Sequence, residues 1–366
     1  MKIALLGDIA IFGCHCLSKN KSFKNYFDKV KKHLSDFDIV IGNLEAPFVK
    51  NESSVFGKSA TVKSHPINVE LLNYLGITHV NLANNHIGDF GIKGYKRTID
   101  LLSINKIEWF GTENKQIDLE IDNEKISLLG FCSYNTNPSA IRFKSKTGLN
   151  YLDARKVYEN VKRNFKNGFL SIVAIHSGQE HVHMPSSEEV KFARKIAQDF
   201  NYIYYGHHPH VIQGFEEIKG SALFYSLGNF IFDDVFTPRD TYKPLIKLSR
   251  HNKTGIIGEV EIQNNKIIKC NSTPIYMSDE SMKIDDEIDD VDLDAYNSIL
   301  KDAGSKEYDQ KRANTIQDFL NSRRQMRDFK WYIRRLNLNS IGILLKAKQN
   351  LRLYQKHFIS KIDLIG

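Results

Sequence analysis

Three histidines directly follow an apolar, aromatic run in the stretch Asn201-Tyr202-Ile203-Tyr204-Tyr205-Gly206-His207-His208-Pro209-His210-Val211-Ile212-Gln213-Gly214. Such a run predicts a buried strand that delivers the next residues into a loop at its C-terminal end. Pro209 has no N–H and biases His208 towards extended geometry, so His208 and His210 can present two imidazoles to one small volume. Imidazole nitrogen suits zinc, iron and other borderline transition metals. The stretch therefore predicts a metal site; the alternative is a polar loop that is rich in histidine by chance.

Polar side chains also follow four other apolar runs that are predicted to be strands, over residues 2–6, 38–41, 78–83 and 169–175. Each polar residue by itself has an ordinary explanation as a helix cap, a turn residue, a core histidine or a solvated charge. Together they supply carboxylate, amide and imidazole donors, the mixed ligand set of a two-metal hydrolytic site. The residues are Asp8, Asn43 with Glu45, Asn84-Asn85-His86, and His176.

The order of the predicted elements indicates an α/β fold. Strand, polar residue and helix alternate, which is typical of a sheet packed by helices with ligands at the C-terminal ends of its strands. Asp122-Asn123 and Asn264-Asn265 predict hairpin turns, so we expect a mixed sheet or a second sheet. The predicted helices cover residues 23–34, 66–75, 92–103, 154–165 and 187–200, and further strands cover 117–121, 125–131, 223–227, 256–262 and 266–275.

Composition allows one large domain with an appendage, since the 366 residues are 41% hydrophobic and 26% charged. The four cysteines match neither a zinc ribbon nor a disulfide framework, so we expect a reducing, cytoplasmic setting. The N-terminal run is predicted to be a strand and is too short for a signal peptide. No run approaches the ~18 apolar residues that span a bilayer.

Charge divides the chain into three predicted parts: a main domain over residues 1–278, an acidic linker over 279–294, and a basic helical extension over 295–366, interrupted by Gly304 and Gly342. Residues 311–366 carry thirteen Lys and Arg against three Asp and Glu, a net charge of +10. Because the whole chain carries +8, the rest is close to neutral, and its charge gives no argument for nucleic acid.

Six motifs in the main domain occur in the order of a known family. They are Leu6-Gly7-Asp8, Gly42-Asn43-Leu44-Glu45-Ala46-Pro47, Asn81-Leu82-Ala83-Asn84-Asn85-His86-Ile87-Gly88-Asp89-Phe90-Gly91, His176-Ser177-Gly178-Gln179-Glu180, Gly206-His207-His208-Pro209-His210-Val211-Ile212-Gln213 and Tyr225-Ser226-Leu227-Gly228-Asn229-Phe230. With these motifs the chain resembles the CapA family of poly-γ-glutamate or capsule biosynthesis proteins, within the calcineurin-like metallophosphatase superfamily. The resemblance covers about residues 1–275 and does not reach the C-terminal extension.

The resemblance implies a four-layer α/β/β/α sandwich with its site at one edge, and it implies roles for individual residues. Asp8 resembles a ligand of a first metal, Asn85 and His176 resemble ligands of a second, and His208 and His210 resemble the pair that divides between them. His86 resembles a histidine that assists catalysis near the leaving group. Further candidates are His207, Asn43, Asn84 and Glu180 as ligands or supports of ligands, and Asn229 as a substrate-binding residue. From the residues alone, Glu180 is equally explained as a solvated charge and Asn229 as a structural turn residue.

Two departures from the superfamily pattern concern the metals. The first motif lacks its histidine, since Asp8 is followed by Ile9-Ala10, and Asn43 stands where a bridging aspartate is expected. An amide cannot bridge two cations as a carboxylate does, although Glu45 could replace it. One metal, a weakly bound second metal and no metal therefore all remain open, with Mn, Fe or Zn as the candidate divalent ions.

Three functions are compatible with these residues. The first is a metal-dependent phosphoesterase in capsule, exopolysaccharide or poly-γ-glutamate biosynthesis, acting on a small molecule or polymer that bears phosphate or carboxylate. The second is a component of a polymer-synthesis or ligase assembly that binds a chain without hydrolysing phosphate. The third is a metal-free scaffold, favoured by Ala10 and Asn43 and disfavoured by the intact histidine set.

Apolar and basic residues alternate in segment 311–366 at a spacing compatible with amphipathic helices. These helices are expected to pack on the sandwich or to form a homodimer. The alternative is a basic anchor on an anionic membrane, which would place a cytoplasmic protein at the periphery of the inner membrane. Single-stranded nucleic acid is the least favoured partner, because the segment has few aromatic residues.

Overall fold

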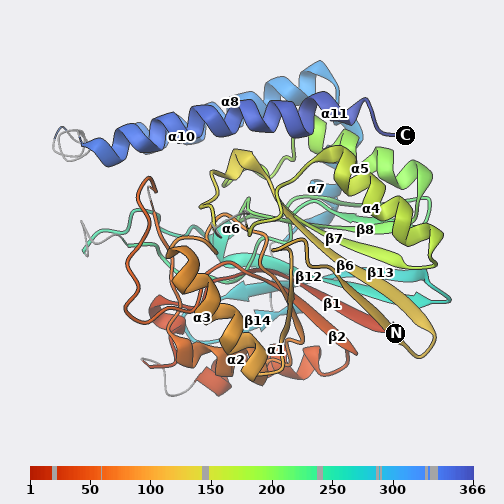
Figure 1. Ribbon diagram of the computed structural model, residues 1–366, viewed down its shortest axis with the longest axis horizontal. Helices are drawn as coiled ribbons and strands as arrows, with labels where there is room; N and C mark the ends of the chain where they lie inside the picture. The colour runs from red at the N-terminus through yellow and green to blue at the C-terminus, as the bar shows by residue number, and fades with distance from the viewer. Residues whose placement is uncertain are drawn as a thin grey trace.

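Two β-sheets lie face to face and are covered by helices in the computed structural model of the protein (Figure 1). The structure describes residues 1–18, 23–58, 60–141, 148–236, 242–285, 288, 291–325, 329 and 337–366.

The first sheet has the strand order β14-β13-β12-β1-β2-β3-β4, and β11 pairs with β1. Strands β1 to β4 run parallel, whereas β12, β13 and β14 are antiparallel to their neighbours. The strands are β1 (Lys2–Ile9), β2 (Ile39–Leu44), β3 (His79–Asn81), β4 (Glu108–Phe110), β11 (Asn229–Ile231), β12 (Thr254–Gln263), β13 (Lys266–Met277) and β14 (Met282–Ile284).

The second sheet has the order β5-β6-β7-β8-β10-β9, with a parallel centre formed by β6, β7, β8 and β10. Both predicted hairpins are present, between β5 and β6 and between β12 and β13. The strands are β5 (Ile117–Ile121), β6 (Glu124–Cys132), β7 (Leu170–His176), β8 (Tyr202–His207), β9 (Phe215–Ile218) and β10 (Ser221–Phe224).

The period of two along each strand explains the layers. In β1, Ile3 and Leu5 enter the core between the sheets, while Ala4 and Leu6 face the core beneath the first group of helices. In β7, Ile172 faces the first sheet, and Val173 faces the helices that cover the second sheet. The outer layers are α1 (Phe23–Leu34), α2 (Val69–Tyr74) and α3 (Gly91–Ile104) on one side, and α4 (Ala154–Lys166), α5 (Ser187–Asp199) and α11 (Ser360–Ile362) on the other. The four-layer α/β/β/α sandwich is confirmed.

The strands and helices begin where their local chemistry dictates. The Asp153 side chain accepts a hydrogen bond from the Lys156 N–H, which caps α4 as predicted. Ser186, one residue before the predicted start, caps α5 in a capping box with Glu189. The strand predicted over 223–227 is wrong in its limits, because β10 ends at Phe224 and Asn229 opens a separate strand, β11.

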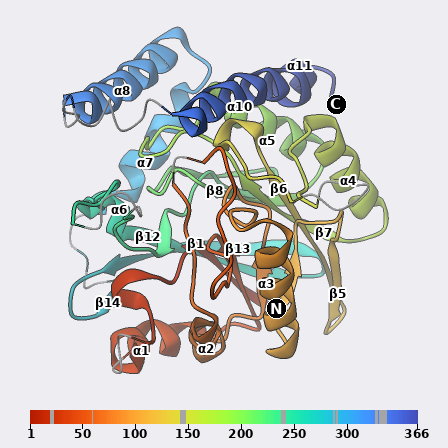
Figure 2. The same cartoon turned by 60° about the vertical axis from the view of Figure 1, so that its left-hand side comes forward.

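The C-terminal helices cross one end of the sandwich, and Figures 1 and 2 show α8 and α10 on the same side of the molecule. Gly304 lies between helices with a φ of +96°, but the predicted interruption at Gly342 is wrong, because α10 continues through it. Parts of the predicted acidic linker form β14 and the start of α7; its residues 286, 287, 289 and 290 lie outside the described residues. The remaining helices are α6 (Arg250–Lys253), α7 (Leu293–Ile299), α8 (Lys306–Gln325) and α10 (Leu338–Tyr354).

The extension is anchored to the sandwich through its final turns. Tyr354, Phe358, Ile362 and Ile365 are buried in the same hydrophobic cluster as α4, α5 and the second sheet. The expectation that the extension packs on the sandwich is therefore confirmed. The described helices include none that is both long and apolar enough to cross a membrane.

Candidate functional site

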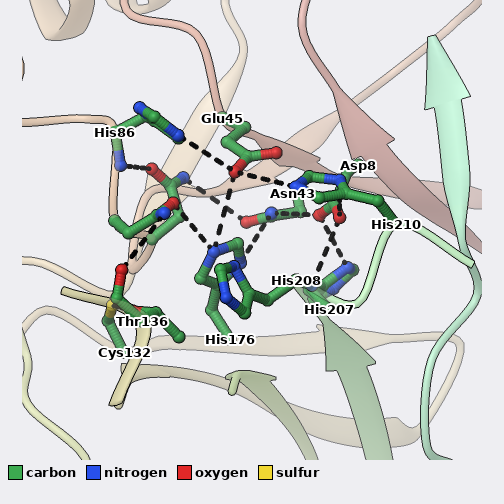
Figure 3. A network of polar contacts seen from close by, with 12 residues as sticks. Asp8, Asn43, Glu45, His86, Cys132, Thr136, His176, His207, His208 and His210 are labelled. Atoms are coloured by element: carbon green, nitrogen blue, oxygen red, sulfur yellow. Dashed lines mark hydrogen bonds and ion pairs between the residues drawn. The ribbon is translucent and has the colours of Figure 1, made fainter. Parts of the chain in front are cut away.

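The polar strand ends meet at one edge of the sandwich (Figure 3). Parallel pairing puts Asp8 of β1 opposite Asn43 of β2, and His176 of β7 opposite His207 of β8. Asn229 of β11 is the partner of Asp8 on its other side. Because parallel strands end at the same edge, residues that are far apart in the sequence form one buried polar cluster.

Asp8 is fully buried at the centre of this cluster. Its Oδ1 accepts a hydrogen bond from Asn43 Nδ2 at 2.7 Å, and its Oδ2 accepts one from the backbone N–H of His208 at 3.2 Å. His207 Nδ1 and His210 Nδ1 lie 3.4 and 3.2 Å from its two oxygens. Burial raises the pKa of Asp8, but the contacts with His207 and His210 outweigh burial and hold the pKa well below its usual value.

Asn43 has its amino group turned towards Asp8 and its carbonyl oxygen turned away. Asn43 Oδ1 accepts hydrogen bonds from Asn81 Nδ2 at 2.9 Å and Asn84 Nδ2 at 3.5 Å. The oxygens of Asn81 and Asn84 both accept backbone N–H groups, so each of these side chains must offer its amino group to Asn43. Asn43 therefore presents a donor, not a ligand atom, to the centre of the site.

Glu45 is a fully buried carboxylate surrounded by imidazoles. Its Oε1 and Oε2 have no hydrogen-bond partner among the residues that the structure describes. Oε1 lies 3.7 Å from His176 Nε2, 3.8 Å from His210 Nε2 and 3.9 Å from His86 Nε2. Burial raises the pKa of Glu45 to about 8. Three imidazole nitrogens around one buried carboxylate form an arrangement that can hold a positive ligand.

The histidine loop has a strained backbone. His208 has a φ of +98° and His210 a φ of +56°, values that cost a residue with a side chain about 1–3 kcal/mol each. In the part of the chain that is described, His208 Nδ1 and His207 Nε2 are buried without a hydrogen-bond partner. Burial would lower the pKa of His210, but the carboxylates of Glu45 and Asp8 outweigh it and raise the pKa to about 10. The strain thus holds imidazole nitrogens in a buried, acidic cluster.

His176 and Asn85 form a second part of the cluster. His176 Nε2 lies 3.0 Å from Asn85 Oδ1, and the Asn85 amino group donates to the backbone oxygen of Thr136. Asn43 Nδ2 lies 3.3 Å from His176 Nδ1, on the other side of the ring. Because Asn43 can only donate there, Nδ1 is the accepting nitrogen of the ring and the ring proton lies on Nε2.

His86 belongs to a hydrogen-bonded pair that the sequence analysis did not identify. His86 Nδ1 lies 2.6 Å from Asp89 Oδ2, and Asp89 also accepts hydrogen bonds from Ser139 Oγ and the Val62 N–H. Lys58 Nζ lies 3.4 Å from Asp89 Oδ1 and donates to the backbone oxygen of Asn85. Burial, reinforced by the charge of Lys58, lowers the pKa of His86. Asp89 follows His86 at a helical-turn spacing of three, a signal that the sequence offered.

Asn229 supports His210 from behind. Asn229 Oδ1 lies 2.9 Å from His210 Nδ1, and its amino group donates to the backbone oxygen of Asn252. Asn252 in turn donates to the backbone oxygen of His210. Asn229 is fully buried, with both ends of its amide occupied. Glu180 is half-buried at the same end of the site; burial raises its pKa, but His208 and His210 outweigh burial and lower it to about 2.

The donor set fits a divalent cation best at Glu45, His208 and His210, whose ligand atoms all lie within 4.8 Å of one another. Carboxylate and imidazole are suitable ligands for Mn, Fe and Zn, and the unpartnered atoms of Glu45 and His208 are what a cation would satisfy. The His176–Asn85 side fits less well, because His176 Nε2 carries the ring proton there. The structure thus brings together all the residues predicted for the site.

Sequence and structure comparisons place this site in a family. The sequence model described as "Bacterial capsule synthesis protein PGA_cap" matches residues 2–234. The capsule biosynthesis protein CapA of Bacillus anthracis is 28% identical over 72% of this chain and 67% of its own length. The PGA biosynthesis protein CapA of Bacillus subtilis is 27% identical over 71% of this chain and 69% of its own length.

Solved structures are more distant. A Staphylococcus aureus structure described as a 5'-nucleotidase aligns with a TM-score of 0.45 at 12% identity, over 82% of this chain and 58% of that chain. An NAD nucleotidase from Haemophilus influenzae aligns with a TM-score of 0.42 at 14% identity, over 89% of this chain and 60% of that chain. Because the sequence model covers well over half of the residues, the chain belongs to the bacterial capsule synthesis protein family PGA_cap.

Proposed function

We propose that this protein is a metal-dependent hydrolase that cleaves a phosphoester during capsule, exopolysaccharide or poly-γ-glutamate biosynthesis. The observation that carries the proposal is the buried Glu45 carboxylate, which has three imidazoles around one of its oxygens and no hydrogen bond from any described residue. Family membership supports the biosynthetic setting. The substrate class is a small molecule or polymer that bears phosphate or carboxylate.

Glu45, His208 and His210 would hold a first divalent cation, Mn, Fe or Zn. A cation bound there would supply Lewis-acid chemistry, stabilising negative charge on reacting oxygens. Asn85 and His176 are the candidates for a second, weaker position. Asp8 would serve mainly by fixing the His207–His210 loop, through its hydrogen bond from the His208 N–H and its contacts with both flanking imidazoles.

Asn229 and Asn43 are better explained as positioning residues than as a substrate ligand and a metal ligand. Asn229 accepts from His210 Nδ1, so His210 keeps Nε2 free to face Glu45. Asn43 donates to Asp8 and so fixes its carboxylate. Neither amide has a free oxygen directed into the centre of the site.

His86 is the proposed proton-transfer residue. Its Nδ1–H donates to Asp89 Oδ2, and its lowered pKa keeps the ring neutral near pH 7. Nε2 therefore faces Glu45 as a proton acceptor. We infer that His86 accepts a proton from the attacking water and that Asp89 stabilises the imidazolium that results, while the leaving oxygen takes its proton from solvent. The family resemblance implies the other role, assistance at the leaving oxygen.

A second candidate function is a polymer-binding component of a synthesis assembly that does not hydrolyse phosphate. The observation that favours it is Asn43, whose amino group lies where a bridging carboxylate would be needed for a two-metal site. The third candidate, a metal-free scaffold, leaves the unsatisfied Glu45 carboxylate unexplained.

Metal analysis of protein purified without chelator, followed by a panel of phosphoesters, tests the proposal. We expect about one Mn, Fe or Zn per chain, and turnover of at least one phosphoester. The double variant His208→Ala/His210→Ala should lose both. Equal metal content in the wild type and the double variant would refute the metal site, whereas bound metal without turnover would favour the polymer-binding function.

A further inference from the structure

The C-terminal extension touches three segments that border the site. Asn339 of α10 accepts a hydrogen bond from the Gly57 N–H at 2.7 Å, next to Lys58. Asn350 of α10 donates to Asn137 at 2.8 Å, just after the Tyr134–Thr136 turn that holds Asn85. The Phe319 ring of α8 lies 4.8 Å from the His181 ring. Figures 1 and 2 show α8 and α10 at the same end of the sandwich.

Lys346 of α10 brings positive charge to the His86 side of the site. It is half-buried and lies one helical turn after Gly342, whose position packs against the Phe56 ring, and Asn339 bonds the same helix to Gly57. Lys58, the next residue along, pairs with Asp89 at 3.4 Å, so α10 adds a further ammonium group beside a carboxylate that is already paired. Burial lowers the pKa of Lys346 to about 8, and the charge of Lys58 acts in the same direction. A half-buried excess of positive charge is stabilised when an anion binds.

Arg323 of α8 brings a second cation to the His210 side. Its guanidinium stacks over Phe319, with 5.5 Å to the ring centroid, and acts electrostatically on Glu180 and His181. His181 is hydrogen-bonded to Asn252, which fixes the His210 backbone. Arg323 is half-buried, whereas its neighbour Arg324 is exposed. Stacking on Phe319, whose ring in turn lies against His181, holds the guanidinium in place at the rim.

We propose that Lys346 and Arg323 are specificity-determining residues, which select a substrate that carries at least two anionic groups. The inference rests on the proposed function: one anionic group occupies the site around Glu45 and His86, and the rim cations bind another. Both residues lie outside residues 2–234, which match the family, so the selection belongs to the extension of this chain.

The anionic groups can be phosphates or carboxylates, and the test separates them. Three probes are titrated calorimetrically into metal-loaded, full-length protein: inorganic phosphate, fructose 1,6-bisphosphate and triglutamate. Inorganic phosphate fills the site alone, the bisphosphate adds a second phosphate, and triglutamate offers carboxylates only. The variants are Lys346→Ala and Arg323→Ala. The controls remove an exposed cation from the same two helices: Lys348→Ala in α10 and Arg324→Ala in α8.

We expect wild-type protein to bind the bisphosphate or triglutamate more tightly than phosphate. Each rim variant should weaken binding of that multivalent anion by about tenfold, while phosphate affinity changes less than twofold. Lys348→Ala and Arg324→Ala should change neither. The variants that keep the positive charge, Lys346→Arg and Arg323→Lys, should keep most of the preference for the multivalent anion over phosphate. A purely structural defect would not depend on charge in this way.

Two failures can be told apart. If metal and phosphate bind but the preference for multivalent anions is absent, or survives in both rim variants, the inference is wrong and the proposed function stands. If wild-type protein binds neither metal nor phosphate, the proposed function fails and the inference fails with it.

Discussion

At the scale of single residues, the orientation of one amide decides what the site can hold. Asn43 is a departure from the superfamily pattern that the sequence shows, but the sequence does not determine which end of the amide faces the site. That depends on Asn81 and Asn84, whose oxygens are occupied by backbone N–H groups of the Ala83–Ile87 segment. Such a chain of donors and acceptors exists only in three dimensions, so the sequence pattern leaves it undetermined.

Restoring a carboxylate at Asn43 should create the bridging ligand that the site lacks. We expect Asn43→Asp to raise the metal content from about one towards two ions per chain, because a carboxylate accepts where the amide donates. The stoichiometry is measured by inductively coupled plasma mass spectrometry after dialysis. Asn25→Asp, which adds the same charge on the exposed side of α1, is the control. An unchanged stoichiometry in Asn43→Asp would show that another residue limits metal binding.

The His86–Asp89 pair predicts a separation between catalysis and metal binding. His86→Ala should keep its metal and lower turnover by roughly 10²–10⁴-fold, the usual range for proton-transfer assistance. Asp89→Asn should lower turnover by about 10–100-fold, because Asp89 fixes the tautomer of His86 without touching the reacting atoms. Turnover and metal content are measured on the same preparations. Loss of metal in His86→Ala would instead identify His86 as a ligand.

At the scale of elements, long apolar runs were predictable, whereas most strands of three or four residues were not; β3 and β10 are the exceptions, predicted with longer limits at 78–83 and 223–227. The runs before Asp8, His176 and His207 are strands because continuous apolar sequence is buried on both faces of a parallel sheet. The strands β4, β9 and β11 have three or four residues, too few for a period of two to be recognised. The role of Asn229 was missed for this reason, since only the pairing of β11 with β1 places it beside Asp8.

Two histidines on different elements should give stability opposite dependences on pH. Burial lowers the pKa of His79, on β3, to about 4, so its neutral form stabilises the fold above pH 6.5. This contribution is lost as the pH falls towards 4 and amounts to on the order of 3 kcal/mol. The hydrogen bond that His33, on α1, donates to the Glu259 carboxylate raises the pKa of His33, so its contribution is present below pH 6.5 and is lost as the pH rises.

Chemical unfolding of His79→Gln and His33→Gln between pH 4.5 and 8.5 measures both contributions. We expect His79→Gln to lose less stability than the wild type on acidification, and His33→Gln to be more destabilising at pH 5.5 than at pH 8.5. Each variant serves as the control for the other, since both replace one imidazole by an amide. Parallel curves for the wild type and both variants would mean that neither histidine has a shifted pKa.

At the scale of the whole molecule, α10 has an inner face that contacts the sandwich and an outer face that is exposed. Its inner face bonds the segments around the site through Asn339 and Asn350. Its outer face exposes Ile341, Leu344 and Leu345 by 54%, 71% and 66%. The spacing of apolar and basic residues predicted amphipathic helices in this segment. It could not assign these three residues to the outer face, because only packing of Tyr354 and Phe358 fixes the rotation of α10.

We expect the outer face of α10 to bind an anionic membrane. Exposed leucines lie beside Lys348 and Arg352 of the same helix, and apolar area combined with cations is the composition that anionic lipid surfaces attract. The protein should sediment with vesicles that contain phosphatidylglycerol at low salt, less at high salt, and not with phosphatidylcholine vesicles. The triple variant Ile341→Ser/Leu344→Ser/Leu345→Ser should stay in the supernatant. Leu364→Ser, which removes an equally exposed leucine from the C-terminal end, should still sediment. If no sample sediments and the wild type elutes as a dimer that the triple variant disrupts, the face is a contact between two copies of this chain and membrane binding is refuted.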